Sequence, residues 1–226
     1  MSRIEILNSG DHQALRLDSP KIGARHFIQV VAAEFATVAA HCPVIFSKNP
    51  DDGRFYAGAM LGFKTDENLL NGGDAVAAGF CPLDVIREGF FISNDNVAID
   101  VDNPRFASGE PMFESDGAPS ERLRQVQRSL GQFKQGLEET DAFIDTLMAL
   151  KLIEPIDITL SFDDGERINL AGVYTVSLDA LHDLSDDEAI ALFRKGWLQL
   201  AYTMIGSLKQ VGALAARRNR ALATAG

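Results

Sequence analysis

Residues 26–46 begin with apolar positions spaced like one face of a helix, and the alanines between them favour helix. These positions are Phe27, Val30, Val31, Phe35 and Val38. Pro43 has no amide proton and disfavours a helical conformation in its predecessor, so we expect the helix to end at or before Cys42. The β-branched and aromatic run at 43–46 then predicts a short strand buried on both faces.

Alternation of apolar and polar residues predicts several further strands. Residues 3–17 alternate loosely around a turn signal at 8–11 and suggest an edge hairpin. Residues 55–63, after the turn signal 49–53, predict a strand antiparallel to 43–46. Residues 156–162 and 168–176 flank Asp163-Asp164-Gly165 and predict a hairpin that continues to Val176.

The residues after Pro119 change to a helical period. Apolar positions step by three and four residues from Leu123 to Leu147, which predicts a long helix over about 121–151 with Ser120 as its N-cap. Gly131 and Gly136 favour a bend or a break within it. Such a stripe is typical both of a dimer interface and of packing on the chain's own sheet.

A second helical region closes the chain. Ser185 and Glu188 form a capping box, so a helix begins there, and apolar residues continue at helical spacing from Trp197 to Leu214. The arginines at 217, 218 and 220 suit a helix C-terminus, where cations meet the negative end of the dipole.

The remaining segments connect these elements. Residues 64–74 are polar and contain Asn71-Gly72-Gly73, which predicts a loop before an apolar segment at 75–91 that Pro82 interrupts. Residues 103–120 show no periodicity and predict an ordered surface loop. Strands and helices alternate irregularly, without an internal repeat or a flexible linker. The sequence therefore predicts one α+β domain over residues 1–226, with a mainly antiparallel sheet and packed helices.

Composition restricts the partners. The chain of 226 residues has a formal net charge of −11, which argues against a nucleic-acid partner and against anionic membrane surfaces. No window approaches the apolar length of a membrane span, so we expect no membrane insertion, and the N-terminus lacks the features of a secretory signal. We therefore expect a cytoplasmic protein. Cys42 and Cys81 lie in apolar surroundings and predict no disulfide framework.

The order of short motifs resembles the bacterial SapC family over nearly the full chain. The motifs are Glu34-Phe35, Pro43-Val44-Ile45-Phe46, Leu61-Gly62, Glu67-Asn68-Leu69, Gly109-Glu110-Pro111-Met112-Phe113, Asp116-Gly117, Leu152-Ile153-Glu154-Pro155, Gly172-Val173-Tyr174, Gly196-Trp197-Leu198 and Ser207-Leu208. The chain departs from the family pattern at Cys42, at the stretch 87–90 that begins with Arg87, and at Thr203-Met204. A site that relatives form at these positions would be altered here. The resemblance implies an association with surface-layer proteins or outer-membrane uptake receptors, and it defines no reaction.

Two carboxylates are the strongest enzymatic candidates. Asp100 and Asp102 fall on one face of a strand predicted over 97–102, where they could bind a metal or act as an acid–base pair. A solvated strand face or a turn-capping role is the alternative. No histidine spacing predicts a metal site, and no motif for a nucleotide cofactor or a serine nucleophile is present, so we expect no metal and no cofactor.

Other residues carry weaker signals for binding. Glu34 lies among apolar residues and predicts pairing with Arg25 or Arg87, or a solvated helix edge. Glu67 and Asn68 suit either helix capping or ligand contact. Trp197 and Tyr202 suit either a pocket or the core. Cys42, next to His41, is interpreted as a packing residue rather than a nucleophile.

These observations support three functional hypotheses. The first is a non-catalytic binding or accessory protein with a small-molecule, peptide or protein partner, working as a homodimer through the helical stripe. The second is an enzyme acting on a peptide or glycan, with Glu34, Asp100 or Asp102 in a cleft. The third is an exported surface-layer component. Whether the protein is an enzyme stays open on the sequence.

Overall fold

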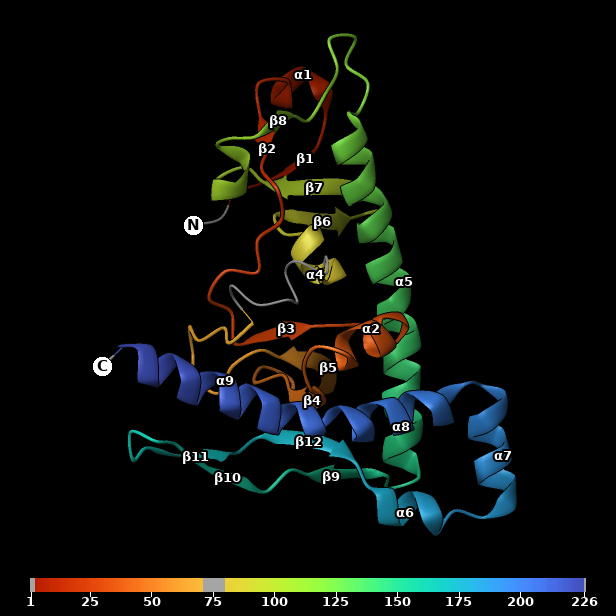
Figure 1. Ribbon diagram of the computed structural model, residues 1–226. Coiled ribbons are helices and arrows are strands. Elements are labelled where there is room, and N and C mark those ends of the chain that lie inside the picture. Colours follow the sequence, from red (N-terminus) through yellow and green to blue (C-terminus); the bar gives the residue numbers. More distant parts are fainter. Residues whose placement is uncertain (1–2, 71–79, 226) are drawn as a thin grey trace. The chain divides into compact units, whose positions relative to one another are not determined.

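The computed structural model describes residues 3–70 and 80–225, and it confirms the α+β class (Figure 1). The chain divides into two compact units, each built from two separate stretches. Unit 1 consists of Met1–Ile22 and Cys81–Gln135, and unit 2 of Gly23–Phe80 and Gly136–Gly226. None of the helices in the described ranges has the length and apolar character needed to cross a bilayer. The loop predicted at 71–73 lies outside the described residues.

Unit 1 contains two small antiparallel sheets. The first has the order β1-β7-β6 and the second pairs β2 with β8. Their bounds are β1 Ile4–Ile6, β2 Arg16–Leu17, β6 Phe90–Ser93, β7 Asn96–Asp100 and β8 Glu110–Pro111. The hairpin predicted over residues 3–17 is therefore wrong, because β1 and β2 belong to different sheets. The short helix α1 (Ser9–His12) separates them, and the Asn8 side chain caps it by accepting a hydrogen bond from the Asp11 amide.

The core of unit 1 also uses the segment predicted as a surface loop. Phe106, Met112 and Phe113 from residues 103–120 are buried against β2, β6, β7 and the start of α5. The 3-10 helix η2 (Pro104–Phe106) holds Arg105, whose guanidinium donates to the carbonyl oxygens of Asp18, Ile86 and Glu88. Helix α4 (Leu83–Ile86) completes the unit. Apolar residues without a regular period can therefore still form core.

Unit 2 is built on a five-stranded antiparallel sheet of order β3-β5-β4-β12-β9. The bounds are β3 Phe27–Gln29, β4 Val44–Lys48, β5 Phe55–Met60, β9 Ile153–Pro155 and β12 Val173–Val176. The strand after Pro43 and its antiparallel pairing with the next strand are confirmed. The helix expected from residue 26 is wrong in its first part, because residues 27–29 add to β5. Only η1 (Ala32–Glu34) and α2 (Phe35–Ala39) are helical there.

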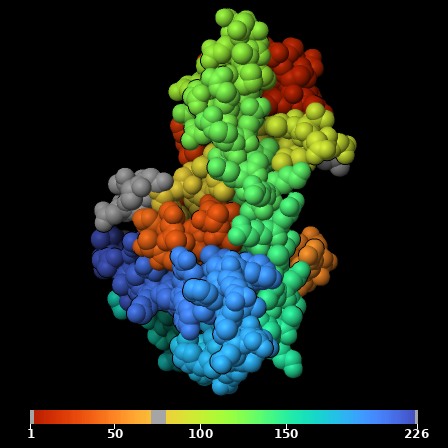
Figure 2. Space-filling view, turned by 90° about the vertical axis from the view of Figure 1, so that its right-hand side faces the viewer, coloured from red at the N-terminus to blue at the C-terminus, as the bar shows by residue number. Residues whose placement is uncertain are grey.

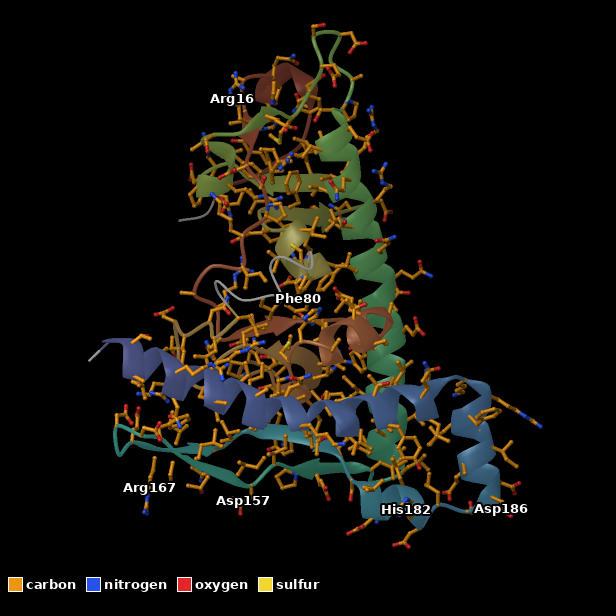
Figure 3. The ribbon with its side chains drawn as sticks, in the orientation of Figure 1. Arg16, Phe80, Asp157, Arg167, His182 and Asp186 are labelled. Carbon is orange, nitrogen blue, oxygen red and sulfur yellow. The ribbon has the colours of Figure 1, made fainter. Side chains whose placement is uncertain are left out.

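The predicted hairpin is confirmed as β10 (Ile158–Ser161) and β11 (Arg167–Leu170). It does not continue to Val176, because the chain turns at Gly172, where φ is +77°, and β12 joins the large sheet instead. Arg167 is exposed and points away from α9, as does Asp157 just before β10 (Figure 3). The hairpin is therefore attached to unit 2 through its other face.

The long helix is confirmed as α5 (Glu121–Ala149), with Ser120 Oγ accepting a hydrogen bond from the Leu123 amide at 3.3 Å. It runs without interruption through Gly131 and Gly136. Its apolar stripe is buried in the chain's own cores: Leu123, Val126, Leu130 and Phe133 in unit 1, and Phe143, Ile144 and Leu147 in unit 2. Packing within the chain thus accounts for the stripe.

Four helices close unit 2: α6 (Leu178–His182), α7 (Asp186–Arg194), α8 (Trp197–Ser207) and α9 (Lys209–Ala225). The capping box between Ser185 and Glu188 is confirmed. Figure 2 shows α7 and α8 in blue on the surface of this unit. On the inner side of α8, Ser207 Oγ accepts a hydrogen bond from the Val44 amide at 2.9 Å. Helix α5 covers the sheet face that carries Phe46, whose ring lies 6.3 Å from that of Phe143.

Candidate functional site

A cavity of about 470 Å³ lies in unit 2, on the sheet face opposite to the one that packs against α5. We call it the His26 cavity. Its walls come from the start of β3, from β4 and β5, from the residues after β5, and from the link between β11 and β12. It is lined by His26, Phe27, Ser47, Tyr56, Met60, Gly62, Phe63, Asn169, Leu170, Ala171, Gly172 and Val173.

A second cavity of about 400 Å³ lies at the turn between β4 and β5, and we call it the Asp52 cavity. It is lined by Gln29, Asn49, Pro50, Asp52, Arg54, Phe55, Tyr56 and Asp141. Tyr56 lines both cavities. The His26 cavity has neutral walls apart from the titratable imidazole, whereas the Asp52 cavity carries two carboxylates and one guanidinium.

Strand register explains the wall of the His26 cavity. Tyr56 is opposite Ser47 across β5 and β4, and Ser47 is opposite Val173 across β4 and β12. Directly opposed residues of an antiparallel pair point to the same face, so these three side chains form one row. Phe27 extends the row, since its ring meets the Tyr56 ring edge-on with centroids 5.7 Å apart.

Gly58 allows Phe27 to lie flat on the sheet. A Cβ atom at Gly58 would fall 2.0 Å from Phe27 Cζ, so no other residue fits without moving that ring. This is the close approach for which a glycine within a strand is suited. The position of Phe27, and with it the shape of the His26 cavity, depends on Gly58.

The polar side chains of the His26 cavity have no partner of their own within the described ranges 3–70 and 80–225. No hydrogen bond joins the side chains of His26, Ser47, Tyr56 or Asn169 to another residue there. His26, Ser47 and Tyr56 are half-buried, and Asn169 is exposed. Buried polar groups are normally hydrogen-bonded, so unpartnered groups in a cavity are available to a ligand or to water.

A brace of charged residues ties the residues after β5, of which Gly62 and Phe63 line the His26 cavity, to the hairpin. Glu67 Oε2 accepts a hydrogen bond from the Phe63 amide at 2.7 Å, and its Oε1 lies 3.2 Å from Arg218 Nε. Arg218 Nη2 in turn lies 2.6 Å from Glu166 Oε2, on the hairpin turn. Lys64 Nζ contacts the other oxygen of Glu166 at 2.5 Å.

Aromatic packing supports the brace. The Phe63 and Phe162 rings have centroids 5.7 Å apart, and the Arg218 guanidinium lies over the Phe162 ring at 4.3 Å. The hydrogen bond from Lys64, and then that from Arg218, holds the pKa of Glu166 below its usual range. Glu166 therefore stays ionised at neutral pH, and the brace stays charged.

The family model SapC matches residues 7–214 of the chain. The chain belongs to the SapC family. Comparison with curated proteins and with solved structures gives no match.

Several SapC motifs meet at the His26 cavity. The pieces Leu61-Gly62 and Glu67-Asn68-Leu69 fold onto each other, since the Leu69 amide donates to the Leu61 carbonyl at 2.8 Å. A Cβ atom at Gly62 would fall 2.1 Å from the Glu67 carbonyl oxygen, so this fold requires glycine. Gly172 and Val173, from the motif Gly172-Val173-Tyr174, also line the cavity.

Glu67 and Asn68, predicted as either capping or ligand residues, take part in this local structure. Glu67 bridges Phe63 and Arg218 as described above. Asn68 donates through Nδ2 to the Gly23 carbonyl at 2.8 Å and accepts from the Leu70 amide at 2.9 Å. Both side chains shape the residues beside the cavity and do not line it. Arg218, predicted to stabilise a helix end, is buried and paired instead.

Glu34 caps its own short helix, because Oε2 accepts a hydrogen bond from the Val31 amide at 3.1 Å. Arg87, one of its predicted partners, contacts Asp84 and lies over the Phe133 ring at 4.5 Å. Each therefore has a local structural role. Neither Glu34 nor Arg87 lines the His26 cavity or the Asp52 cavity.

Asp100 and Asp102 do not share a strand face, which corrects the predicted pair. Strand β7 ends at Asp100, and Asp102 lies in the turn that follows. Asp100 Oδ1 accepts hydrogen bonds from the amides of Arg3 at 3.1 Å and Asp102 at 3.3 Å. The carboxylate thus caps the turn, which is the alternative role considered for it.

Trp197 and Tyr202 lie on α8 and line neither cavity. Trp197 is buried, and its ring lies 6.0 Å from that of Phe143, whereas Tyr202 is 45% exposed. Cys42 is fully buried, and this burial raises the pKa of its thiol to about 12. The thiol is protonated at neutral pH, as expected for a packing residue. Across the described part of the chain, His, Cys, Asp and Glu form no cluster of three or more that could hold a metal ion.

The residues of the His26 cavity carry only a faint signal in the sequence. Ser47 follows the buried Phe46 in β4 and Tyr56 precedes the buried Ala57 in β5, so each lies on the opposite face of its strand from a buried neighbour. Their convergence with His26 and Asn169 depends on strand order. Sequence reasoning therefore missed the site, although it found the Gly62 and Gly172 motifs that border it.

Proposed function

We propose that this member of the SapC family is a non-catalytic binding protein that holds a neutral ligand in the His26 cavity. The observation that supports the proposal is the set of unpartnered polar side chains, His26, Ser47, Tyr56 and Asn169, on walls that are otherwise aromatic or apolar. Apolar walls with a few convergent polar groups are typical of ligand sites in proteins.

The lining indicates the chemistry of the ligand. Hydroxyl, amide and imidazole groups both donate and accept hydrogen bonds, so they suit a ligand with both kinds of group. The rings of Phe27, Tyr56 and Phe63 suit an apolar surface on the same ligand. Among the residues that the structure describes, no carboxylate, ammonium or guanidinium lines this cavity, so an ionised group would lose its hydration there without a counter-charge from them.

Thermal unfolding with a ligand panel tests the proposal. We would titrate the full chain with neutral sugars and with acetylated, amidated dipeptides, because a ligand that binds only the folded state raises Tm in proportion to its concentration over Kd. Ser47→Leu, which fills the cavity, should abolish the rise in Tm. Ser161→Leu, at an exposed position of β10, should leave it intact. A rise in Tm that survives Ser47→Leu, or no rise with any compound, would overturn the proposal.

The family membership supports a finer proposal, in which the protein acts as an accessory to a surface-layer or outer-membrane uptake system. We also propose a cytoplasmic location, while the homodimer stays a prediction from the sequence, because the stripe that motivated it is buried within the chain. Cell fractionation tests the location, and recovery in the outer membrane or the medium would favour the exported alternative. Light scattering at high protein concentration tests the dimer, and a monomer would exclude it.

A further inference from the structure

Strand β3 is the end strand of the large sheet within the described residues. The Val30 amide donates to the Ala57 carbonyl, and the His26 carbonyl accepts from the Leu61 amide. The main-chain amide and carbonyl groups of the even-numbered residues in this stretch therefore point toward β5. The Met60 amide, opposite Phe27, donates to Pro43 of β4 instead. Because main-chain groups alternate in direction along an antiparallel strand, those of Phe27 and Gln29 point away from the sheet.

These outward groups have no internal partner. No hydrogen bond links the amides or carbonyls of Phe27 and Gln29 to another residue in the described part of the chain, and both residues are only half-buried. Exposed sheet edges of this kind are templates for pairing with a further strand.

The two cavities lie along this edge. Phe27 lines the His26 cavity and Gln29 lines the Asp52 cavity, and Tyr56 lies in the wall of both. Residues 27 and 29 are two positions apart on one strand, so their side chains point to the same face. A strand placed beside β3 would therefore place side chains two positions apart next to Phe27 and Gln29, and so beside the two cavities that these residues line.

We propose that an extended peptide segment pairs with the outer edge of β3, with a Tyr or Trp side chain, which is neutral and has both an apolar ring and a hydrogen-bonding group, in the His26 cavity and a Lys or Arg side chain at the Asp52 cavity. This inference rests on the proposed function and names the class of ligand. The main-chain groups of Phe27 and Gln29 supply the pairing, and alternate side chains supply the specificity, as in other cases of strand addition.

The charges of the Asp52 cavity favour a basic side chain. The cavity is lined by two carboxylates, Asp52 and Asp141, and by one guanidinium, Arg54. The amide groups of Asn49 and Gln29 can bond to a ligand group of either charge. Asp141 has no ion pair or hydrogen bond through its side chain within the described ranges, so its carboxylate is available. The Asp52 side chain accepts only from the nearby Arg54 amide at 3.0 Å.

A positional-scanning library of short, end-capped peptides, bound to the full chain, tests the proposal. Selected peptides should carry Lys or Arg two positions from Tyr or Trp. N-methylation should weaken binding by at least about ten-fold at alternate amides and have little effect at the amides between them, because only every second amide faces β3. That period of two distinguishes strand pairing from binding by side chains alone.

Matched variants test the basic position. Asp141→Asn should lower the affinity for a Lys-containing peptide by about three- to five-fold, which is the size expected for an exposed ion pair. The affinity for the analogue with norleucine in place of Lys should not change. Asp145→Asn, one turn further along α5 and also exposed, is the control and should change the affinity for neither peptide. Selected peptides without the basic residue, or N-methylation effects without the period of two, would overturn the strand-pairing proposal.

The outcomes separate the two proposals. If no peptide binds but a neutral sugar raises Tm in a way that Ser47→Leu abolishes, the peptide inference fails and the proposed function stands. If neither the library nor the panel yields a ligand sensitive to Ser47→Leu, both fail.

Discussion

The two faces of the five-stranded sheet in unit 2 differ in how they are closed. On the helix face, Val44, Phe46, Ala57 and Ala59 are at most 1% exposed, and the Phe46 ring lies 6.3 Å from that of Phe143 on α5. On the other face, Ile45 and Met60 are buried as well, whereas Ser47 and Tyr56 are half-buried and line cavities. The same strands thus supply a packed core on one side and, beside buried residues, a ligand surface on the other.

Stability and ligand binding therefore depend on different faces of the sheet. Close packing on the helix face leaves no room for a ligand, and changes of volume there act on stability. Substitutions on the cavity face remove groups that make no internal hydrogen bond, so they should affect binding with little effect on stability. The predictions below test this division, beginning with the largest effect.

Phe143→Ala should lower the free energy of unfolding by about 3–5 kcal/mol, because a fully buried ring in contact with Phe35, Phe46 and Trp197 would leave a cavity. Chemical denaturation measures the change. A loss below about 1 kcal/mol would mean that the helix face is not the packed core described here.

Gly136→Ala should destabilise the protein by about 1–3 kcal/mol, because a Cβ atom there would lie 2.6 Å from Val31 Cγ2. Gly131→Ala on the same helix meets no atom within 4 Å and should stabilise it by up to about 1 kcal/mol, since alanine favours helix. Denaturation of the two variants side by side provides the control. Equal effects at the two positions would contradict the close contact between α5 and Val31.

The brace beside the His26 cavity should weaken in acid. The pKa of Glu166 is lower in the folded state than in the unfolded chain, so its stabilising contribution is present above the unfolded pKa and is lost as pH falls through the folded value. Wild type should therefore exceed Glu166→Gln in unfolding free energy at neutral pH, and the difference should shrink once pH falls below the usual Glu pKa of about 4.3 and disappear only below the lower pKa of the folded state. A difference that does not depend on pH would show that the Glu166 carboxylate does not contribute through its charge.

Sequence reasoning identified elements whose determinants are local. The long helix, the capping box at Ser185 and the hairpin around Gly165 depend on spacing and on turn residues, and all three are confirmed. Residues 27–29 have a helical pattern but form a strand, because pairing with β5 outweighs local preference.

The candidate site, too, depends on contacts between residues that are distant in sequence. Asp100 and Asp102 attracted notice because they are close in sequence, yet β7 ends between them. His26, Ser47, Tyr56 and Asn169 come from four separate segments, and only strand order brings them together. The ion pairs of Arg218 could not be predicted for the same reason, since its partners Glu67 and Glu166 are distant in sequence.

The most direct test of the central claim is an NMR titration of the full chain with the neutral ligand panel, monitoring backbone amides and the His26 imidazole. We expect chemical-shift changes centred on His26, Ser47, Tyr56 and Asn169 that Ser47→Leu abolishes. Changes confined to the helices α6 to α9, or changes that persist in Ser47→Leu, would contradict it.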